Sequence, residues 1–257
     1  MFRHNDPDYF PGPAIWDTNT EPPTSGHSQP PVLASIIWRI VQMGTEYDKR
    51  KAIEVFPKLM AYHRWFSAAR DPKNSGVISI IHPWESGRDN CPDWDIGMRN
   101  VVVPDNLESY ARRDTSHVDS DQRPTQEQYD RFITIVKFGR ECGWDNQTIH
   151  AKGPFLMADP GVQFIFLRAS RDLLAMAQQL GMDMAVDEIR GWVDRVEAGS
   201  DFLWNEEVGG YCARDLRTGQ FSDAITNAST LSFFADVGSP EQRASMAAHC
   251  RLSLIHI

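Results

Sequence analysis

The chain has 257 residues, of which 41% are hydrophobic and 11% aromatic, enough apolar side chains for one large domain or two small ones. This composition excludes a wholly disordered chain. Lys and Arg number 26 against 35 Asp and Glu, which gives a formal net charge of -9. Because an acidic surface repels phosphate backbones and anionic membranes, we expect neither a nucleic acid nor a membrane as a partner.

The cysteines and the amino terminus indicate which classes of protein the chain does not resemble. Cys91, Cys142, Cys212 and Cys250 are widely spaced, with no C-x-x-C pair, so we expect no disulfide framework, no metal site and no cofactor. The polar, proline-rich start differs from a secretory signal, and no apolar run reaches the ~18 residues of a membrane span. These features predict a soluble, cytoplasmic protein.

The carboxyl end reads LSLIHI at residues 252–257. The end of a common transposon-based sequencing adapter encodes the same residues in frame, so we interpret this segment as a read-through tail and exclude it from the fold. The alternative is an ordinary apolar tail. Residues 1–251 remain as one predicted domain.

The first part of the chain is predicted to be an ordered loop followed by a helix. Seven prolines within residues 5–31 exclude a continuous helix or a central strand. Tyr9, Phe10 and Trp16 among them favour a loop packed on the body over a disordered linker. Apolar residues at helical spacing then predict a helix over residues 32–44. Its apolar face consists of Leu33, Ile36, Ile37, Ile40 and Val41.

A second helix is predicted over residues 47–69, where Pro57 marks a kink or a restart. Its inward face consists of Ile53, Phe56, Leu59, Met60, His63 and Phe66. A short apolar stretch at residues 77–81 then leads into a dense polar cluster. A long polar segment follows at residues 98–123.

Capping signals mark two further helices. Thr125 and Gln128 form a capping box for a helix that ends near residue 142. Asp159 and Pro160 suit the N-cap and first positions of a helix that ends before Gly181. We therefore interpret Asp159 as a capping residue in preference to a catalytic one.

The remainder of the chain is also mainly helical in pattern. A helix is predicted over residues 183–204, and helices resume near residues 224 and 240. Between them, residues 206–221 read as a β-hairpin with turns at its glycines. Because no strand alternates with the helices in a βαβ rhythm, the fold class is predicted to be all-α with long loops on one rim.

Residues 82–95, with the sequence HPWESGRDNCPDWD, form the densest polar cluster in the chain. Glycosidic cleavage requires a carboxylic acid to protonate the departing oxygen and a second carboxylate across the sugar ring. Tryptophans beside carboxyl groups suit this chemistry, because an indole supplies an apolar wall and a platform for the sugar. The cluster is therefore a candidate carbohydrate site.

Two other interpretations of the cluster stay open on composition alone. An acidic surface loop whose tryptophans plug into the core is typical of such sequences. A calcium loop is disfavoured, because the ligand order of an EF-hand is absent and Pro92 interrupts the segment.

The same residues resemble a known family. The segment 82–95 is similar to the Trp-Glu-Ser-Gly-x-Asp-Asn-Ser-Pro segment of glycoside hydrolase family 63, which includes processing α-glucosidase I and the mannosylglycerate and glucosylglycerate hydrolases. Cys91 stands where the family commonly has Ser. The resemblance covers about residues 7–236. Its supporting segments are SGHSQPP at 25–31, RP at 123–124, FLMADP at 155–160, LRASRDL at 167–173 and LWNEE at 203–207.

The resemblance implies an (α/α)6 toroid, incomplete in this chain, and inverting hydrolysis of a small α-glucoside or α-mannoside. The family's general acid, the Asp of Ser-Gly-x-Asp, falls on Asp89. The residues that would then line the subsite of the cleaved sugar are Trp84, Glu85, Gly87, Arg88 and Asn90. Cys91 is a change small enough for the loop to survive.

Arg123 and Gln29 are further candidates for substrate binding. A guanidinium such as that of Arg123 can hold the carboxylate of a glycerate group with two parallel hydrogen bonds. The alternative for Arg123 is a surface arginine beside a helix start. Gln29 can donate to sugar hydroxyls, and it is equally suited to capping a loop.

The general base is not found in the sequence. In the family a Glu near the carboxyl end of the toroid activates water, and no matching segment precedes residue 252. Inversion requires that carboxylate ~6.5–9.5 Å from the acid. Glu85 and Asp93 are too near Asp89 in sequence to be assigned across a sugar ring.

The leading hypothesis is therefore a metal-independent α-glycosidase that acts on glucosylglycerate or mannosylglycerate and draws its base from outside this chain. One rival is a non-catalytic carbohydrate-binding helical scaffold. Another is a different (α/α)-toroid sugar enzyme, such as an epimerase or a trehalase-like hydrolase. The sequence of residues 84–89 favours the first hypothesis over the last.

Overall fold

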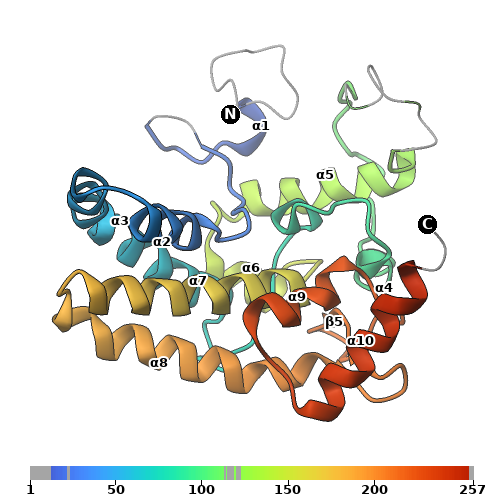
Figure 1. Ribbon diagram of the computed structural model, residues 1–257. Coiled ribbons are helices and arrows are strands. Elements are labelled where there is room, and N and C mark those ends of the chain that lie inside the picture. Colours follow the sequence, from blue (N-terminus) through green and yellow to red (C-terminus); the bar gives the residue numbers. More distant parts are fainter. Residues whose placement is uncertain (1–12, 22–23, 113, 115–118, 120–122, 255–257) are drawn as a thin grey trace.

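A computed structural model describes residues 13–21, 24–112, 114, 119 and 123–254, and it is mostly helical (Figure 1). No helix in this described part is long and apolar enough to cross a membrane. The longer helices are α2 (Leu33–Met43), α3 (Glu46–Arg70), α5 (Gln126–Glu141), α7 (Pro160–Gln179), α8 (Asp183–Gly199), α9 (Asn227–Ala235) and α10 (Pro240–Leu254). The shorter ones are α1 (Pro13–Trp16), α4 (Asp95–Met98) and α6 (Asn146–Lys152).

The predicted helices are confirmed with small shifts at their ends. Helix α1 is one turn inside the predicted loop of residues 5–31, whose first part lies outside the described residues. Helix α6 was not predicted. Helix α10 extends through the first half of the suspected tail to Leu254, and residues 255–257 lie outside the described part.

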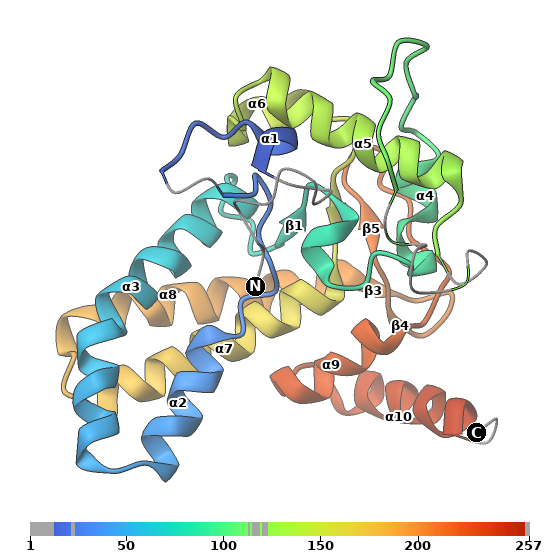
Figure 2. The same cartoon turned by 90° about the horizontal axis from the view of Figure 1, so that it is seen from above.

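Helix α7 lies at the centre of the helical layer, where it packs against α2, α8 and α9 (Figures 1 and 2). The Asp159 carboxylate accepts hydrogen bonds from the backbone N–H groups of Gly161 and Val162 at 2.9 and 3.2 Å. These bonds satisfy two of the free donors at the helix start, so the predicted N-cap is confirmed. Beyond the helix, Gly181 has a φ of 69°, the left-handed conformation that commonly ends a helix.

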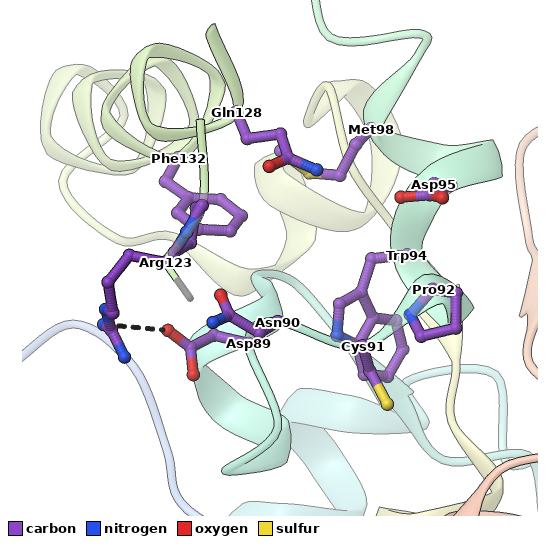
Figure 3. Close-up of a pocket in the computed structure, with 11 residues that line it drawn as sticks. Asp89, Asn90, Cys91, Pro92, Trp94, Asp95, Met98, Arg123, Gln128 and Phe132 are labelled. Carbon is purple, nitrogen blue, oxygen red and sulfur yellow. Dashed lines mark ion pairs between the residues drawn. The ribbon is translucent and has the colours of Figure 1, made fainter. Parts of the chain in front are cut away.

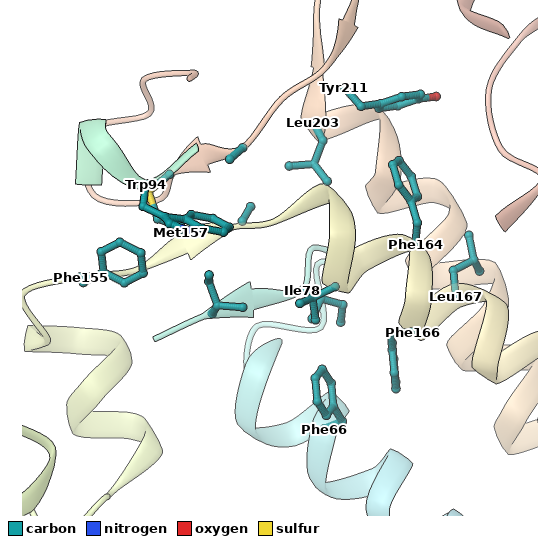
Figure 4. Close-up of a cluster of buried hydrophobic side chains, with 14 of the residues drawn as sticks. Phe66, Ile78, Trp94, Phe155, Met157, Phe164, Phe166, Leu167, Leu203 and Tyr211 are labelled. Carbon is teal, nitrogen blue, oxygen red and sulfur yellow. The ribbon is translucent and has the colours of Figure 1, made fainter. Parts of the chain in front are cut away.

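The main core forms where α7 meets the segments on either side of the motif (Figure 4). Its fully buried members include Phe66, Ile78, Trp94, Phe155, Met157, Phe164, Phe166, Leu167, Leu203 and Tyr211. Burial of each large apolar side chain contributes about 1.5–3 kcal/mol. The core thus joins α3, α7 and the residues that follow Asp89 into one body.

Helix α3 runs without a break from Glu46 to Arg70, so the chain does not restart at Pro57. Most of its predicted inward face is buried. The exception is Ile53, which is 40% exposed. The prediction for Ile53 was wrong because helical spacing identifies an apolar face but not how far the neighbouring helices cover it.

Five short strands accompany the helices in the described part of the chain. Strands β1 (Ser79–Ile80), β2 (Met157–Ala158) and β5 (Arg214–Asp215) form an antiparallel sheet in that order, and β3 (Trp204–Asn205) pairs with β4 (Gly210–Tyr211). The predicted hairpin of residues 206–221 is therefore divided. Its first turn joins β3 to β4, whereas β5 pairs with β2 and with Phe221. Strand β1 directly precedes the polar cluster of residues 82–95.

The predicted loop of residues 24–31 is ordered and packs on the motif. The indole of Trp144 fills the space beside Gly26 and Gly139, so a side chain at either glycine would overlap the ring. The His27 ring lies 4.4 Å from the His82 ring, between centroids, and is surrounded by Trp16, Trp84 and Trp144.

His82 and His27 differ in their hydrogen bonding. Nδ1 of His82 accepts from the backbone N–H of Trp84, so its Nε2 donates to the Phe132 carbonyl and the ring is neutral. Both ring nitrogens of His27 are buried without a hydrogen-bond partner among the residues that the structure describes. Burial, together with the charge of Arg70, holds the pKa of His27 well below its usual range.

His27 is expected to make the fold acid-sensitive. In the folded chain the His27 ring stays neutral, whereas in the unfolded chain it binds a proton near pH 6.5. The free energy of unfolding therefore falls as the pH drops below 6.5, by up to ~1.4 kcal/mol per pH unit. A His27→Phe chain should lose less stability between pH 7.5 and 5.5 in urea unfolding. His82 and His63 act in the same sense in both chains, so parallel pH curves would contradict the assignment to His27.

The apolar face of α2 is wider than the surface that covers it. Val41 is buried against α7, as predicted. Leu33, Ile36, Ile40 and Met43 instead form a stripe that is 48–72% exposed. The predicted single face is thus corrected to two, of which only one is covered in the described structure. Exposed stripes of this kind promote association.

The 257-residue chain is therefore expected to associate in solution. Replacing Ile36 and Ile40 together by Glu should shift it toward monomer in sedimentation velocity, without lowering its melting temperature. The control is Val41→Glu, which buries a charge on the opposite face of the same helix and should unfold the chain. A wild-type chain that is monomeric at all concentrations would contradict the role given to the stripe.

Candidate active site

The candidate site is built on a tight turn that follows β1. A 3-10 turn spans Pro83–Ser86, and Gly87 then adopts a φ of 69°, which only glycine accepts without strain. Oγ of Ser86 donates to the Pro83 carbonyl and accepts from the backbone N–H of Arg88 at 3.0 Å. This turn presents Asp89 and Asn90 at the protein surface.

Glu85 lies behind the turn in a fully buried ion pair. Arg70 donates to its two carboxylate oxygens at 3.2 and 2.6 Å. Ser28 donates through both its backbone N–H and its hydroxyl, and the N–H of Ile81 completes the set. Burial acts to raise the pKa of Glu85, but Arg70 and these donors outweigh it, so the pKa lies below its usual value. Glu85 therefore ties the turn to α3 and to the loop of residues 24–31.

Arg88 points into the opposite side of the turn. Its guanidinium pairs with Asp93 at 3.2 Å and with Asp159 at 2.8 Å, and both carboxylates are fully buried. It also lies over the Trp94 ring, 5.2 Å from the centroid. Arg88 thus connects the turn to the start of α7.

Cys91 also belongs to this network. Its Sγ lies 3.2 Å from Nη1 of Arg88. Burial and the neighbouring Asp93 raise the pKa of the Cys91 thiol to about 11, so the thiol stays neutral, as the family's usual Ser would. The turn accommodates this substitution.

A hollow of about 380 Å³ opens beside Asp89 (Figure 3). Arg123 and Asp89 lie at one end of the hollow, and Asp95 and Met98 lie at the other. Trp94, Pro124 and Phe132 supply apolar surface, and Gln128 adds a polar group. A hollow with charged ends and an aromatic wall suits a small polar ligand.

The Asp89 carboxylate is held loosely. Its Oδ2 lies 4.0 Å from Nη2 of Arg123, and the two side chains are 33% and 28% exposed. A partly exposed pair at this distance stabilises the fold by less than about 1 kcal/mol. Arg123 is anchored more closely through its Nε, which lies 3.2 Å from Asp114, and Asp114 also pairs with Arg112.

The structure divides the predicted site residues into two groups. Asp89, Asn90 and Arg123 line the hollow. The others lie behind the hollow and do not line it. Glu85 and Arg88 are in the ion pairs described above, and Gly87 forms the turn. Trp84 packs among the rings around His27, and Gln29 donates to the Trp84 carbonyl at 3.3 Å.

Four further residues of the hollow were not predicted from the sequence: Asp95, Met98, Gln128 and Phe132. Asp95 lies inside the motif itself, and Gln128 and Phe132 are one helical turn apart on α5, which starts soon after Arg123. Their spacing was a usable signal. The missing information was that α5 packs against the motif.

Comparisons with known proteins identify the family of the chain. A family model described as the mannosylglycerate hydrolase MGH1-like glycoside hydrolase domain matches residues 1–253. The mannosylglycerate hydrolase of Thermus thermophilus is 41% identical over 253 residues, covering 96% of this chain and 60% of that protein. The glucosylglycerate hydrolase of Mycolicibacterium hassiacum is 33% identical over 232 residues, covering 84% of this chain and 51% of that protein.

Solved structures show the same arrangement of helices. The family 63 mannosylglycerate hydrolase from Thermus thermophilus, in complex with Tris, has a TM-score of 0.90 at 38% identity, covering 96% of this chain and 59% of that one. Complexes of that protein with Tris and D-glycerate and with glucose have TM-scores of 0.89 and 0.84. The predicted toroid fold is confirmed, and the chain spans about 60% of the length of its Thermus relative. It belongs to the MGH1-like mannosylglycerate hydrolase domains of glycoside hydrolase family 63.

Proposed function

We propose that this chain supplies the acid side of the active site of an inverting α-glycosidase that cleaves glucosylglycerate or mannosylglycerate, with Asp89 as the general acid. The observation that carries the proposal is the position of Asp89, after a glycine turn at the edge of an aromatic-walled hollow and beside Arg123. Its relatives are named for hydrolysis of these two glycosides.

The acid acts by proton transfer to the leaving group. A carboxylic acid at position 89 gives its proton to the glycosidic oxygen as the bond to the sugar breaks. The oxygen of the departing glycerate then leaves as a hydroxyl group and not as an alkoxide. The Asp89 side chain is only partly exposed, which leaves it accessible to a ligand in the hollow. Trp94 and Phe132 supply apolar surface beside it.

Arg123 suits the carboxylate of the glycerate group. One edge of its guanidinium is anchored to Asp114, and its Nη2 faces the hollow beside Asp89. An arginine held this way can bind a carboxylate through two N–H groups. The Thermus structure was solved with D-glycerate bound, and that ligand carries such a group.

The base is expected from outside this chain. Glu85 and Asp93 are the carboxylates nearest to Asp89 in sequence that the motif offers, and both are fully buried in ion pairs, so neither can activate water. Inversion requires a second carboxylate ~6.5–9.5 Å from the acid. The 257-residue chain by itself is therefore expected to hydrolyse little or no substrate.

Asp89→Asn is expected to lower kcat for the glycerate glycosides by about 100-fold or more, because general acid catalysis contributes about 10²–10⁴-fold. The measurement uses the polypeptide that carries this chain at the full length of its relatives. Asp105→Asn, at an exposed carboxylate that does not line the hollow, is the matched control and should retain most activity. Undiminished turnover by the Asp89→Asn protein would remove Asp89 from its role.

Arg123→Gln is expected to raise KM for glucosylglycerate or mannosylglycerate by about 10-fold to 100-fold, because a hydrogen bond to a charged group contributes about 1.5–3 kcal/mol. The matching methyl α-glycoside has no carboxylate, so its KM should not change. Arg140→Gln on α5 is the control, because Arg140 pairs with the exposed Glu108. Equal effects on both substrates would contradict carboxylate recognition by Arg123.

A further inference from the structure

We propose that Asp159 and Asp93 are positioning residues: acting through Arg88, they fix the peptide that carries Asp89 for the hydrolysis proposed above. The inference rests on that proposed function and extends it to two carboxylates that do not line the hollow. It also gives Asp159 a second role beside its capping of α7.

The three side chains form a compact buried triad. Nη2 of Arg88 donates to Asp159 at 2.8 Å, and Nη1 donates to Asp93 at 3.2 Å. Nη1 also lies 3.3 Å from the Thr226 hydroxyl, which in turn donates to Asp93 at 3.2 Å. Thr226 is the N-cap residue of α9. The triad therefore fixes Arg88 against the starts of two helices at once.

The backbone of Arg88 is held as firmly as its side chain. Its carbonyl accepts from the indole N–H of Trp94 at 2.9 Å and from the backbone N–H of Cys91 at 3.1 Å, while its own N–H donates to Ser86. That carbonyl belongs to the peptide that joins Arg88 to Asp89. The position of the Asp89 Cα is thus set by Arg88, because the side-chain pairing of Asp89 with Arg123 is loose.

Stability alone does not explain this arrangement. Two buried carboxylates share one guanidinium, so the charges do not balance within the triad. Burial raises the pKa of Asp159 in spite of its pairing with Arg88, which shows the cost of desolvating it. Replacing buried ionic groups by packed apolar ones is often neutral or stabilising. The triad instead fixes the orientation of the Arg88 side chain, because the planar guanidinium is held at both terminal nitrogens.

A positioning role differs from sugar binding by Arg88. Only 14% of the Arg88 side chain is exposed, and both terminal nitrogens already donate to protein groups. Catalysis is sensitive to such positioning, since misplacement by ~1 Å can cost about 100-fold in rate. The expected defect on losing the triad is therefore poor proton delivery, with substrate binding retained.

The test compares two leaving groups in the polypeptide at the full length of its relatives. A glycerate glycoside needs its leaving oxygen protonated, whereas the corresponding α-glycosyl fluoride loses fluoride without a general acid. Asp159→Asn keeps the size and the capping oxygen of the side chain but removes the charge that holds Arg88. We expect kcat on the glycerate glycoside to fall about 10-fold to 100-fold with little change in KM, and turnover of the fluoride to be spared.

Further variants separate the outcomes. Asp93→Asn and Arg88→Lys should show the same pattern, because lysine keeps the charge but cannot hold both carboxylates in a fixed fork. Arg64→Met is the control, since it removes an exposed arginine ion pair with Glu188 that joins α3 to α8, and it should affect neither substrate. Equal losses on both substrates in the Asp159→Asn and Asp93→Asn proteins would overturn the positioning role while leaving hydrolysis established.

Asp89→Asn distinguishes this failure from failure of the proposed function. It should be slow on the glycerate glycoside and active on the fluoride, with a larger difference than any triad variant shows. If the wild-type protein hydrolyses neither substrate, or if Asp89→Asn is fully active on both, the proposed function fails and the positioning inference is overturned with it.

Discussion

The buried ion pair between Arg70 and Glu85 is the interaction on which the rest of the site depends. It joins the last residue of α3 to the 3-10 turn, and Ser28 and Ile81 donate to the same carboxylate. Removing one partner of a buried pair costs about 3–5 kcal/mol, because the other charge stays buried without compensation. Three separate segments therefore meet at one carboxylate: the end of α3, the loop with Ser28, and the stretch that leads from β1 into the turn. The direction of the turn toward Asp89 follows from these contacts.

The acidic groups of the motif differ in how deeply they are buried and in what they contact. Glu85 and Asp93 face inward and are enclosed by Arg70 and Arg88, whereas Asp89 and Asp95 face the hollow. Composition treats these four carboxylates alike. Their different environments arise because the turn at Gly87 reverses the chain between Glu85 and Asp89, and the two arginines then hold the inward-facing members.

Much of the helical framework could be predicted from local signals, because caps and apolar spacing lie within a few residues of each other. Asp159 and Thr125 are examples. Longer-range pairings could not be predicted: Arg70 lies 15 residues from Glu85, and Asp159 lies 71 residues from Arg88. Periodicity also failed to show how much of α2 is covered. Asp89 was proposed as the acid from the family resemblance, while the contacts that support its turn required the three-dimensional structure.

In the proposed reaction Arg123 contacts both the carboxylate of the substrate and the proposed acid, Asp89. In the structure its guanidinium is shared between Asp114 and Asp89. A glycerate carboxylate that bound Arg123 would compete with Asp89 for the same cation and would bring a second negative charge close to it. In the proposed reaction Arg123 would therefore exchange its contact with Asp89 for two hydrogen bonds to the substrate carboxylate. A neutral glycoside in the same hollow could not make this exchange.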